Sequence, residues 1–290
     1  MDRELIKKIL PRNFVNLIRK MVYPEKIGLL ENDLGDLFKT YYNNIAASDL
    51  SQKIAIRNAE FKVFSKHGLD GILLYIFSKV GVTNRTFAEM GVEAGRECNT
   101  ANLSINFGWQ GMIIDGNKEL IESAKIYYQG KKVKPVYCFV TAENINQLLI
   151  DNDIHGEIDL FSMDVDGNDY WIWKAINVIR PRVVVAEYNA AFGLKPITIK
   201  YNPDFHYQRD SYFGASLAAL AKLAKEKGYI LVGCDRHGHD AFFARKDVAE
   251  GKFIELSAQE AFYPNPSVIK KIGSLEKQFE LLKHRDFDYV

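Results

Sequence analysis

Short apolar runs alternate with helical stretches along the chain from Arg85 onward. The runs are RTFAEMG (85–91), QGMIIDG (110–116), KPVYCFVT (134–141), IDLFSMDVD (158–166) and PRVVVAEYN (181–189). Such nearly continuous hydrophobicity is typical of strands buried on both faces, and segments such as NKELIESAKIYY between them have helical spacing. The alternation therefore predicts an α/β fold with a parallel sheet and helices on both of its faces.

The regions on either side of this pattern differ from it. Apolar positions recur at three and four in LLENDLGDLFKTYYNNI (29–45) and in AEFKVFSKHGLDGILLYIFSKVG (59–81), which predicts helices. Later, GYILVGC and DAFFAR follow the helical segment SLAALAKLAKEKG and predict a terminal hairpin, and the last forty residues predict a loop and a charged exposed helix. We expect an N-terminal helical extension over 1–80, a main domain over 81–250 and a C-terminal loop and helix over 251–290.

Composition limits the partners. The formal net charge is +1, from 38 Lys and Arg against 37 Asp and Glu, so no overall field attracts nucleic acid or acidic lipid, and a small-molecule partner fits better. The three cysteines lie far apart and form no CxxC motif, which favours a reducing compartment and predicts the cytoplasm. No segment reaches about 18 uncharged apolar residues, so no membrane span is expected.

Ligands of open parallel sheets bind beyond the carboxyl ends of the strands, so the residues that end each run are candidates for a site. The first run ends in a turn from Glu89 to Gly95. Its glycines either let a ligand approach the main chain or only let the chain turn from the strand into the next helix. Asp115 follows Gly91 by 24 residues, and is either a ribose-binding carboxylate or a turn residue. Residues 141–144 can read an adenine edge, cap the next helix, or do both.

The stretch FSMDVDGNDYW (161–171) is open to three interpretations. A calcium loop of the EF-hand type is excluded, because Gly167 is the fourth residue from Asp164 instead of the sixth and Ala175 stands where a bidentate Glu is required. A glycosyltransferase DxD site remains conceivable, with Asp164 and Asp166 holding a divalent ion, but it leaves the glycine turn and Asp115 unexplained. The third interpretation explains them all: a fourth strand ends here and directs Asp164 towards a cofactor.

Further polar residues follow the fourth and fifth runs. Asp164 and Asp166 are two residues apart, as are Glu187 and Asn189, and residues two apart on a strand share a face. Converging in one crevice, these four can bind a hard divalent ion such as Mg²⁺, or one carboxylate can act as a general base. The alternative is that Asp166 and its neighbours cap the next helix. His206, in the insert after the fifth run, can line an acceptor pocket or act as a base, whereas His237 and His239 are expected in a solvated hairpin turn.

Several blocks, taken in order, resemble one known family. SKHGLDGILLYIFSKVG, FAEMGVEAGRECNTANLSINFGWQGMIIDGNKE, AENIN, IDLFSMDVDGNDYWIWKAI and RVVVAEYN look like the FkbM-like branch of class I S-adenosylmethionine-dependent methyltransferases, over about residues 60 to 245. The resemblance implies a Rossmann-like seven-stranded sheet with a reversed final strand and an S-adenosylmethionine-binding main domain. It departs from the family pattern at Leu69, where the family has an acidic residue.

The resemblance also implies roles for individual residues. The cofactor-binding residues that it implies are Glu89, Gly91, Glu93, Gly95, Asp115, Gly116, Asn117, Ala142, Glu143, Asn144 and Asp164. The strand-end spacing and the insert after the fifth run give the other candidates: for catalysis Asp164, Asp166, Glu187 and His206, and for a metal Asp164, Asp166, Glu187 and Asn189.

The implied chemistry is in-line transfer of the sulfonium methyl to a hydroxyl of a small polar acceptor of sugar type, with a carboxylate or a bound divalent cation activating the hydroxyl. Two alternatives stay open: a metal-dependent glycosyltransferase that uses DVD, and a catalytically inactive protein that keeps the fold for binding. The N-terminal helices can also make a homo-oligomer.

Overall fold

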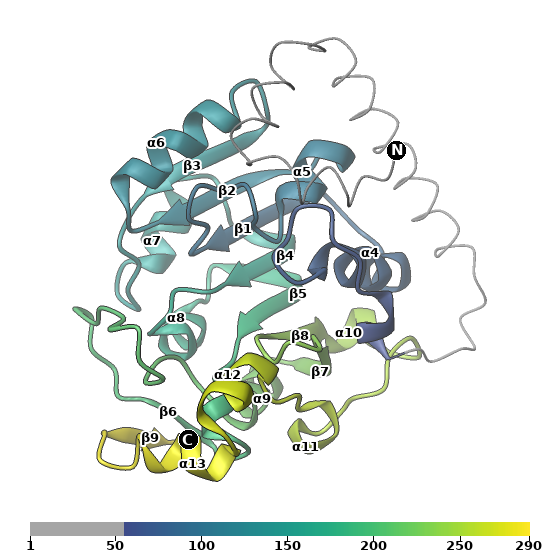
Figure 1. The fold of residues 1–290 in the computed structure, drawn as a ribbon. Helices are drawn as coiled ribbons and strands as arrows, with labels where there is room; N and C mark the ends of the chain where they lie inside the picture. Colours follow the sequence, from purple (N-terminus) through teal and green to yellow (C-terminus); the bar gives the residue numbers. More distant parts are fainter. Residues whose placement is uncertain (1–54) are drawn as a thin grey trace, which may run out of the picture. The chain divides into compact units, whose positions relative to one another are not determined.

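A seven-stranded sheet forms the centre of the protein (Figure 1), and the computed structural model describes residues 55–290. Its strands lie in the order β3-β2-β1-β4-β5-β8-β7. Their bounds are Thr86–Met90 (β1), Gln110–Asp115 (β2), Val133–Tyr137 (β3), Gly156–Met163 (β4), Ile179–Glu187 (β5), Tyr229–Cys234 (β7) and Asp240–Arg245 (β8). Strands β1 to β5 pair in parallel, and β8 is antiparallel to both of its neighbours. The predicted Rossmann-like sheet with one reversed strand is confirmed.

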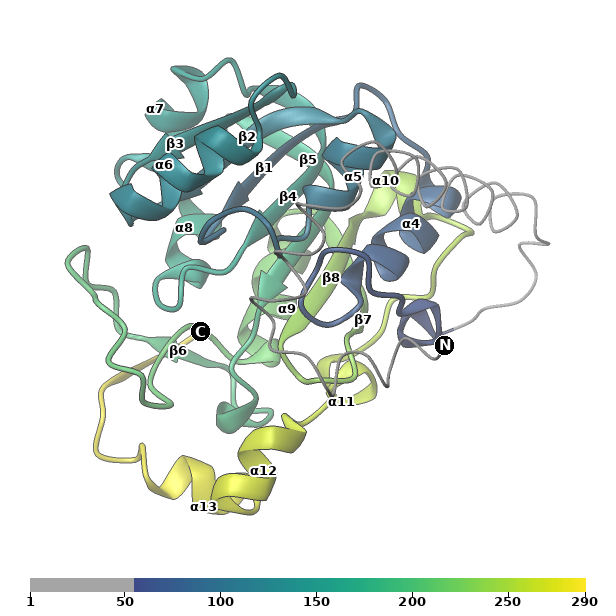
Figure 2. The same ribbon diagram turned by 45° about the horizontal axis from the view of Figure 1, so that its top comes forward.

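Helices cover both faces of this sheet (Figures 1 and 2). On one face lie α4 (Leu69–Val80), α5 (Ala101–Phe107) and α6 (Lys118–Tyr127); on the other lie α7 (Ile145–Ile150), α8 (Asp169–Ala175) and α9 (Leu217–Glu226). Side chains of α7, α8 and α9, among them Leu149, Trp173 and Leu220, share one buried cluster with β4, β5 and β8. Because both faces are covered, the central strands are apolar nearly throughout, as the sequence indicated.

The strand register brings four loops to one edge of the sheet. Met90 pairs with Ile114 of β2 and with Met163 of β4, and Met163 pairs in turn with Ala186 of β5. These four strands therefore end within one residue of the same level.

The helix before β1 is shorter than the periodicity of residues 59–81 predicts, because α4 begins at Leu69. The preceding residues form a 3₁₀ helix, η1 (Ile56–Ala59), and then a loop. One oxygen of Asp70 accepts hydrogen bonds from the backbone N–H groups of Val63, Phe64 and Ser65, at 2.8 to 2.9 Å, and so stabilises the loop in place of a helical turn. The helix predicted over 29–45 lies outside the described residues.

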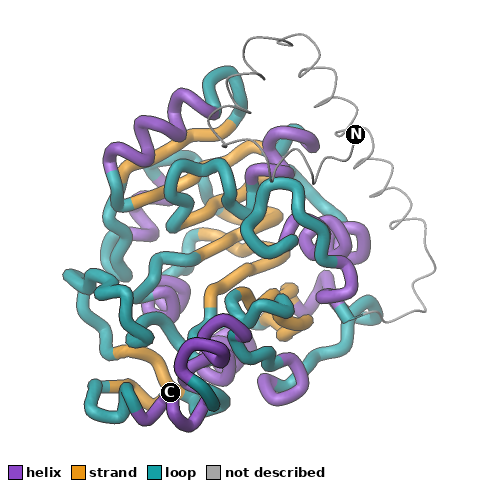
Figure 3. The backbone as a smooth tube through the Cα atoms, in the orientation of Figure 1, coloured by secondary structure: helices purple, strands orange, loops and turns teal. Residues whose placement is uncertain are grey.

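The C-terminal part holds more elements than the expected loop and helix (Figure 3). After α10 (Lys246–Ala249) come α11 (Ala258–Ala261), α12 (Pro266–Ile272), α13 (Leu275–Glu280) and β9 (Phe287–Tyr289). Strand β9 pairs antiparallel with β6 (Ile197–Ile199), which follows the short helix η2 (Ala190–Phe192). The division at residues 80 and 250 stays a prediction. Among the described helices, none has the length and apolarity that a bilayer span requires.

Candidate functional site

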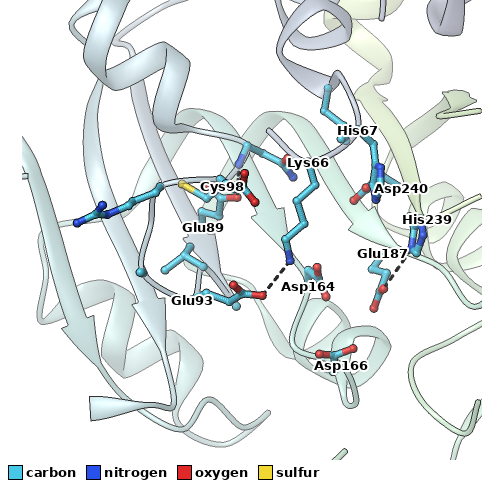
Figure 4. A pocket seen from close by; sticks show the side chains of 17 residues that line it. Lys66, His67, Glu89, Glu93, Cys98, Asp164, Asp166, Glu187, His239 and Asp240 are labelled. Carbon is cyan, nitrogen blue, oxygen red and sulfur yellow. Dashed lines mark hydrogen bonds and ion pairs between the residues drawn. The ribbon is translucent and has the colours of Figure 1, made fainter. Parts of the chain in front are cut away.

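Two cavities meet at the carboxyl ends of the parallel strands. The first, which we call the acidic cavity, has a volume of about 230 Å³ and lies at the ends of β1, β4 and β5 (Figure 4). The second, the β2 cavity, has a volume of about 270 Å³ and lies at the ends of β2 and β3. Both are lined by Lys66, Gly91, Glu93, Asp164 and Asp166. The two cavities are therefore neighbours along one groove, at the edge where the sequence predicts a ligand.

Position 91, which lines both cavities, has room only for glycine. Gly91 has a φ of +73°, and a Cβ atom there would lie 1.5 Å from the carbonyl oxygen of Asp164. Gly95 is similarly constrained, with a φ of +68° and Ile113 and Tyr128 each 2.9 Å from where a Cβ would lie. The glycine turn thus has a packing role, because it lets the end of β1 lie directly against the end of β4, and it leaves the main chain open to the groove.

Glu89 lies at the end of β1 and is buried. Its carboxylate accepts hydrogen bonds from the backbone N–H groups of Asn99 and Thr100, at 2.8 and 2.9 Å, and from the Thr100 hydroxyl. Burial raises the pKa of Glu89, and these hydrogen bonds oppose the rise. Glu89 therefore holds the chain that enters α5 while it lines the acidic cavity.

Asp115 joins the β2 cavity to the glycine turn. One of its oxygens accepts a hydrogen bond from the Glu93 N–H at 2.7 Å, and the other accepts one from the Asn117 N–H at 2.8 Å. Burial raises the pKa of this half-buried carboxyl group. Asn117 in turn caps α6 through its side-chain oxygen, and Gly116 packs against Phe139. Asp115 is therefore fixed at the tip of β2, with Asp115 and Gly116 lining the cavity.

The three residues predicted near the adenine do not line the β2 cavity; they are Ala142, Glu143 and Asn144. Among the described residues after β3, Cys138, Phe139 and Val140 line it instead. Asn144 supports them, because its Nδ2 donates to the Phe139 carbonyl at 2.9 Å and its Oδ1 accepts from the Thr141 N–H at 2.9 Å. The Tyr201 hydroxyl bonds both Glu143 and the Ala142 N–H, which ties this turn to the insert after β5.

Three of the four metal candidates come together in the acidic cavity. One carboxylate oxygen from each of Asp164, Asp166 and Glu187 lies within 4.8 Å of the others. Burial and the neighbouring acids raise the pKa of Asp164 and that of Glu187, and raise the pKa of Asp166 to about 6. The Oε2 atom of Glu187 is buried without a hydrogen-bond partner. Three carboxylates this close need a cation or shared protons to offset their charges: a side-chain hydrogen bond joins Asp164 and Glu187, and the three oxygens are of the kind that a hard divalent ion takes as ligands.

The structure does not bring Asn189 into this cluster. Strand β5 ends at Glu187, and the Asn189 side chain accepts from the Ala191 N–H while its amide donates to the carbonyls of Ser211 and Phe213, at 3.0, 2.8 and 3.0 Å. Its hydrogen-bonding groups are thereby used to hold the insert after β5. His206 also lies outside: it is exposed, and its ring lies 5.0 Å from that of Phe139, whereas its neighbours Phe205 and Tyr207 line the β2 cavity.

Lys66 was not among the residues singled out from the sequence. Its ammonium group lies 2.9 Å from a carboxylate oxygen of Glu93, and the negative charges of Glu93, Asp164 and Asp166 raise its pKa against the opposing effect of burial. The loop that Asp70 stabilises carries Lys66, whose side chain reaches between Glu93 and Asp164 (Figure 4) and lines both cavities. A lone lysine in a loop has no distinctive sequence pattern, so only its position in space identifies it.

The hairpin histidines are partly exposed, as expected of a turn, but both also stack on a third histidine. The ring of His67 lies 4.5 Å from that of His237 and 4.8 Å from that of His239, and both pairs are stacked. Burial, and then the charges of the other two histidines, lowers the pKa of His67 to about 4. At neutral pH the His67 ring, which stacks on both other histidines, is therefore uncharged. His67 and His239 line the acidic cavity beside Glu187.

Comparison with known proteins gives structural similarity only. No protein-family model and no curated protein matches the sequence. Similar solved structures include an S-adenosylmethionine-dependent methyltransferase from Clostridium acetobutylicum, at 14% identity over 61% of this chain and 90% of that one, with a TM-score of 0.42.

Two further similar structures have related descriptions. One is a TehB-like SAM-dependent methyltransferase from Corynebacterium glutamicum (14% identity, 74% of this chain and 99% of that one, TM-score 0.37). The other is an O-methyltransferase from Bacillus cereus in complex with SAH (15%, 79% and 94%, TM-score 0.39). Similarities this remote do not decide activity or acceptor, and the FkbM-like resemblance is not confirmed by them and stays a prediction.

Proposed function

We propose that this protein is an S-adenosylmethionine-dependent methyltransferase that acts on a hydroxyl of a small polar acceptor. The observation that carries the proposal is the pair of adjoining cavities at the carboxyl ends of β1, β2 and β4, with an open glycine turn at one strand end and the fixed carboxylate Asp115 at the next. This is the edge at which open α/β sheets bind nucleotide-type ligands.

The β2 cavity suits the nucleoside part of the cofactor. Asp115 would accept hydrogen bonds from ribose hydroxyls, while Phe139, Phe205 and Tyr207 supply apolar and aromatic surface for a base. The open main chain at Gly91 leads from there into the acidic cavity. When bound, S-adenosylmethionine supplies an electrophilic methyl group, so the chain itself has only to align the acceptor and accept its proton.

The acidic cavity suits the acceptor. Asp164, Asp166 and Glu187 offer oxygens that accept hydrogen bonds from hydroxyl groups, and one of them would take the proton of the reacting hydroxyl. The same three oxygens would hold a divalent cation such as Mg²⁺, which when bound lowers the pKa of a hydroxyl group. The unpartnered Oε2 of Glu187 is the observation that fits such an ion. A hydroxyl-rich, sugar-type substrate matches a cavity with many oxygens that accept hydrogen bonds. We also propose a cytoplasmic location and the formation of a homo-oligomer.

Thermal unfolding with added ligands tests the proposal directly. We would measure it with S-adenosylhomocysteine or a uridine nucleotide sugar, each with Mg²⁺ and with EDTA. A ligand at a hundred times its dissociation constant stabilises a protein by about 2.7 kcal/mol, a shift of several degrees for a chain of this size. S-adenosylhomocysteine should give that shift, and an additional shift with Mg²⁺ would point to the acidic cavity.

The same experiment separates the alternatives. A response to the nucleotide sugar alone would contradict the methyltransferase proposal and assign DVD to a glycosyltransferase site. Binding of S-adenosylhomocysteine without methylation of any hydroxylated acceptor in a broad screen would indicate an inactive binding protein. Asp151→Ala, which removes an exposed carboxylate outside both cavities, serves as a control and should respond like the unaltered protein.

A further inference from the structure

The turn between β7 and β8 is hydrogen-bonded to a buried carboxylate and lies beside Glu187. The carboxylate of Asp235, which is buried, accepts hydrogen bonds from the backbone N–H groups of His237, His239 and Asp240, at 3.2, 2.9 and 3.1 Å. Asp240 is the register partner of Glu187 across β5 and β8. The turn therefore holds His239 at a set position at the edge of the acidic cavity.

The segment before α12 packs tightly against this turn. A Cβ atom at Gly238, which has a φ of +70°, would lie 2.7 Å from backbone atoms of Tyr263, Pro264 and Asn265. The buried Tyr188, which follows Glu187, donates from its hydroxyl to the Tyr263 carbonyl at 2.6 Å. Residues 263–265 are thus attached both to the hairpin turn and to the end of β5.

The orientation of the Asn265 amide follows from its capping role. Its Oδ1 accepts hydrogen bonds from the N–H groups of Ser267 and Val268, at 3.0 and 3.1 Å, and caps α12. Its Nδ2 therefore points the other way, and it lies 3.0 Å from Nε2 of His239. Because an amide nitrogen only donates, Nε2 of His239 must accept, and the ring proton must be on Nδ1.

That Nδ1 atom faces the acidic cluster. It lies 3.9 Å from Oε1 of Glu187, and the stacked ring of His67, at an interplanar angle of 9°, holds the plane of the imidazole. The tautomer decides what Glu187 meets: an N–H group with a partial positive charge attracts Oε1, whereas a bare nitrogen lone pair would repel it. With Oε1 directed at His239, the unpartnered Oε2 is the oxygen left for an acceptor or a cation.

We infer that Asn265 holds His239 in the Nδ1–H tautomer, and that His239 thereby acts as a positioning residue for Glu187. The inference deepens the proposed function, since its importance for methyl transfer rests on that proposal. The contacts themselves do not depend on it. Through Asn265, the C-terminal segment, which contributes no strand to the main sheet, is connected directly to the site.

Nitrogen NMR of ¹⁵N-histidine-labelled protein tests the tautomer, with His239 assigned by comparison with His239→Gln. We expect the Nδ1–H form in the unaltered protein. In Asn265→Asp, measured at pH 8.5 so that the imidazole stays neutral, the new carboxylate still caps α12 but accepts from Nε2, so His239 should change to the Nε2–H form. Ser274→Asp, which adds a carboxylate at the cap of α13, is the matched control and should leave the tautomer unchanged.

Crystal structures of the unaltered protein and of Asn265→Asp test the second step. Loss of the Nδ1–H group should turn the Glu187 carboxylate away from His239 in the variant, while S-adenosylhomocysteine affinity stays within twofold because the β2 cavity is unchanged. If the variant does not fold, Asn265→Ser, which caps without donating from an amide, should give a mixture of tautomers. An Nε2–H form in the unaltered protein, or an unmoved Glu187, would overturn the inference; failure of S-adenosylhomocysteine to bind would overturn only the proposed function.

Discussion

Replacing Asp166 with asparagine should stabilise the protein at pH 8 and have little effect on stability near pH 4. Asp166 has a φ of +52°, a conformation that asparagine tolerates as well as aspartate, so the backbone itself is not perturbed. What changes is the charge: the asparagine amide is neutral at every pH, whereas the carboxylate must ionise in a partly buried position near the carboxylates of Asp169 and Glu93.

The size of the effect follows from the pKa of Asp166. Burial, and then the charge of Asp169, raises this pKa from 3.8 to about 6. At 1.36 kcal/mol per pH unit, the ionised group would destabilise the folded state by about 3 kcal/mol. Because the side chain is partly exposed and therefore screened by solvent, we expect about 1 kcal/mol, or 2 to 4 °C in the unfolding temperature.

The sign follows from proton linkage. When folding raises the pKa of a carboxyl group, the folded state binds more protons between the two pKa values, so stability falls as the pH rises. The destabilisation by Asp166 is therefore almost absent below pH 3.8, grows towards pH 6 and is complete above it. The difference between Asp166→Asn and the unaltered protein should follow the same curve.

Urea unfolding at pH 4, 6 and 8 in the presence of EDTA measures this difference. Asp151→Asn, at an exposed carboxylate outside the cavities, provides the control and should show no such trend. Saturating Mg²⁺ at pH 8 should stabilise the unaltered protein more than the variant if the three carboxylates hold an ion. A variant less stable than the unaltered protein at pH 8, or a difference independent of pH, would refute the electrostatic reasoning.

Four other substitutions test the site. Gly91→Ala should lower the free energy of unfolding by more than about 3 kcal/mol, because the new Cβ would lie 1.5 Å from a backbone oxygen. The control Gly108→Ala, also at positive φ but with no atom within 4 Å of the new Cβ, should lower it by about 1 kcal/mol. Equal losses would contradict the packing argument. Asp115→Ala should weaken S-adenosylhomocysteine binding about tenfold in calorimetry with little loss of fold, and unchanged affinity would remove Asp115 from the site. Asp164→Asn and Glu187→Gln should each abolish methyl transfer in folded protein, and full activity in both would make the acid cluster structural.

Much of the site could be predicted from strand ends alone. The apolar runs placed Asp115, Asp164 and Glu187 at the ends of strands, and parallel strands of similar length end at one edge of a sheet. The rule that residues two apart share a face holds only within a strand. It fails for Asn189, because β5 ends at Glu187 and the chain then turns into η2.

The sequence by itself determined the class of fold and the strand ends at which a ligand would meet the chain, because hydrophobic periodicity is a local property that each segment expresses independently. Only the tertiary structure decided that Lys66 lies over the acid cluster, that His67 stacks on His239, and that Asn265 of the C-terminal segment contacts His239. These residues come from loops far apart in sequence, and their meeting depends on backbone contacts, such as those at Gly238, that no local pattern encodes.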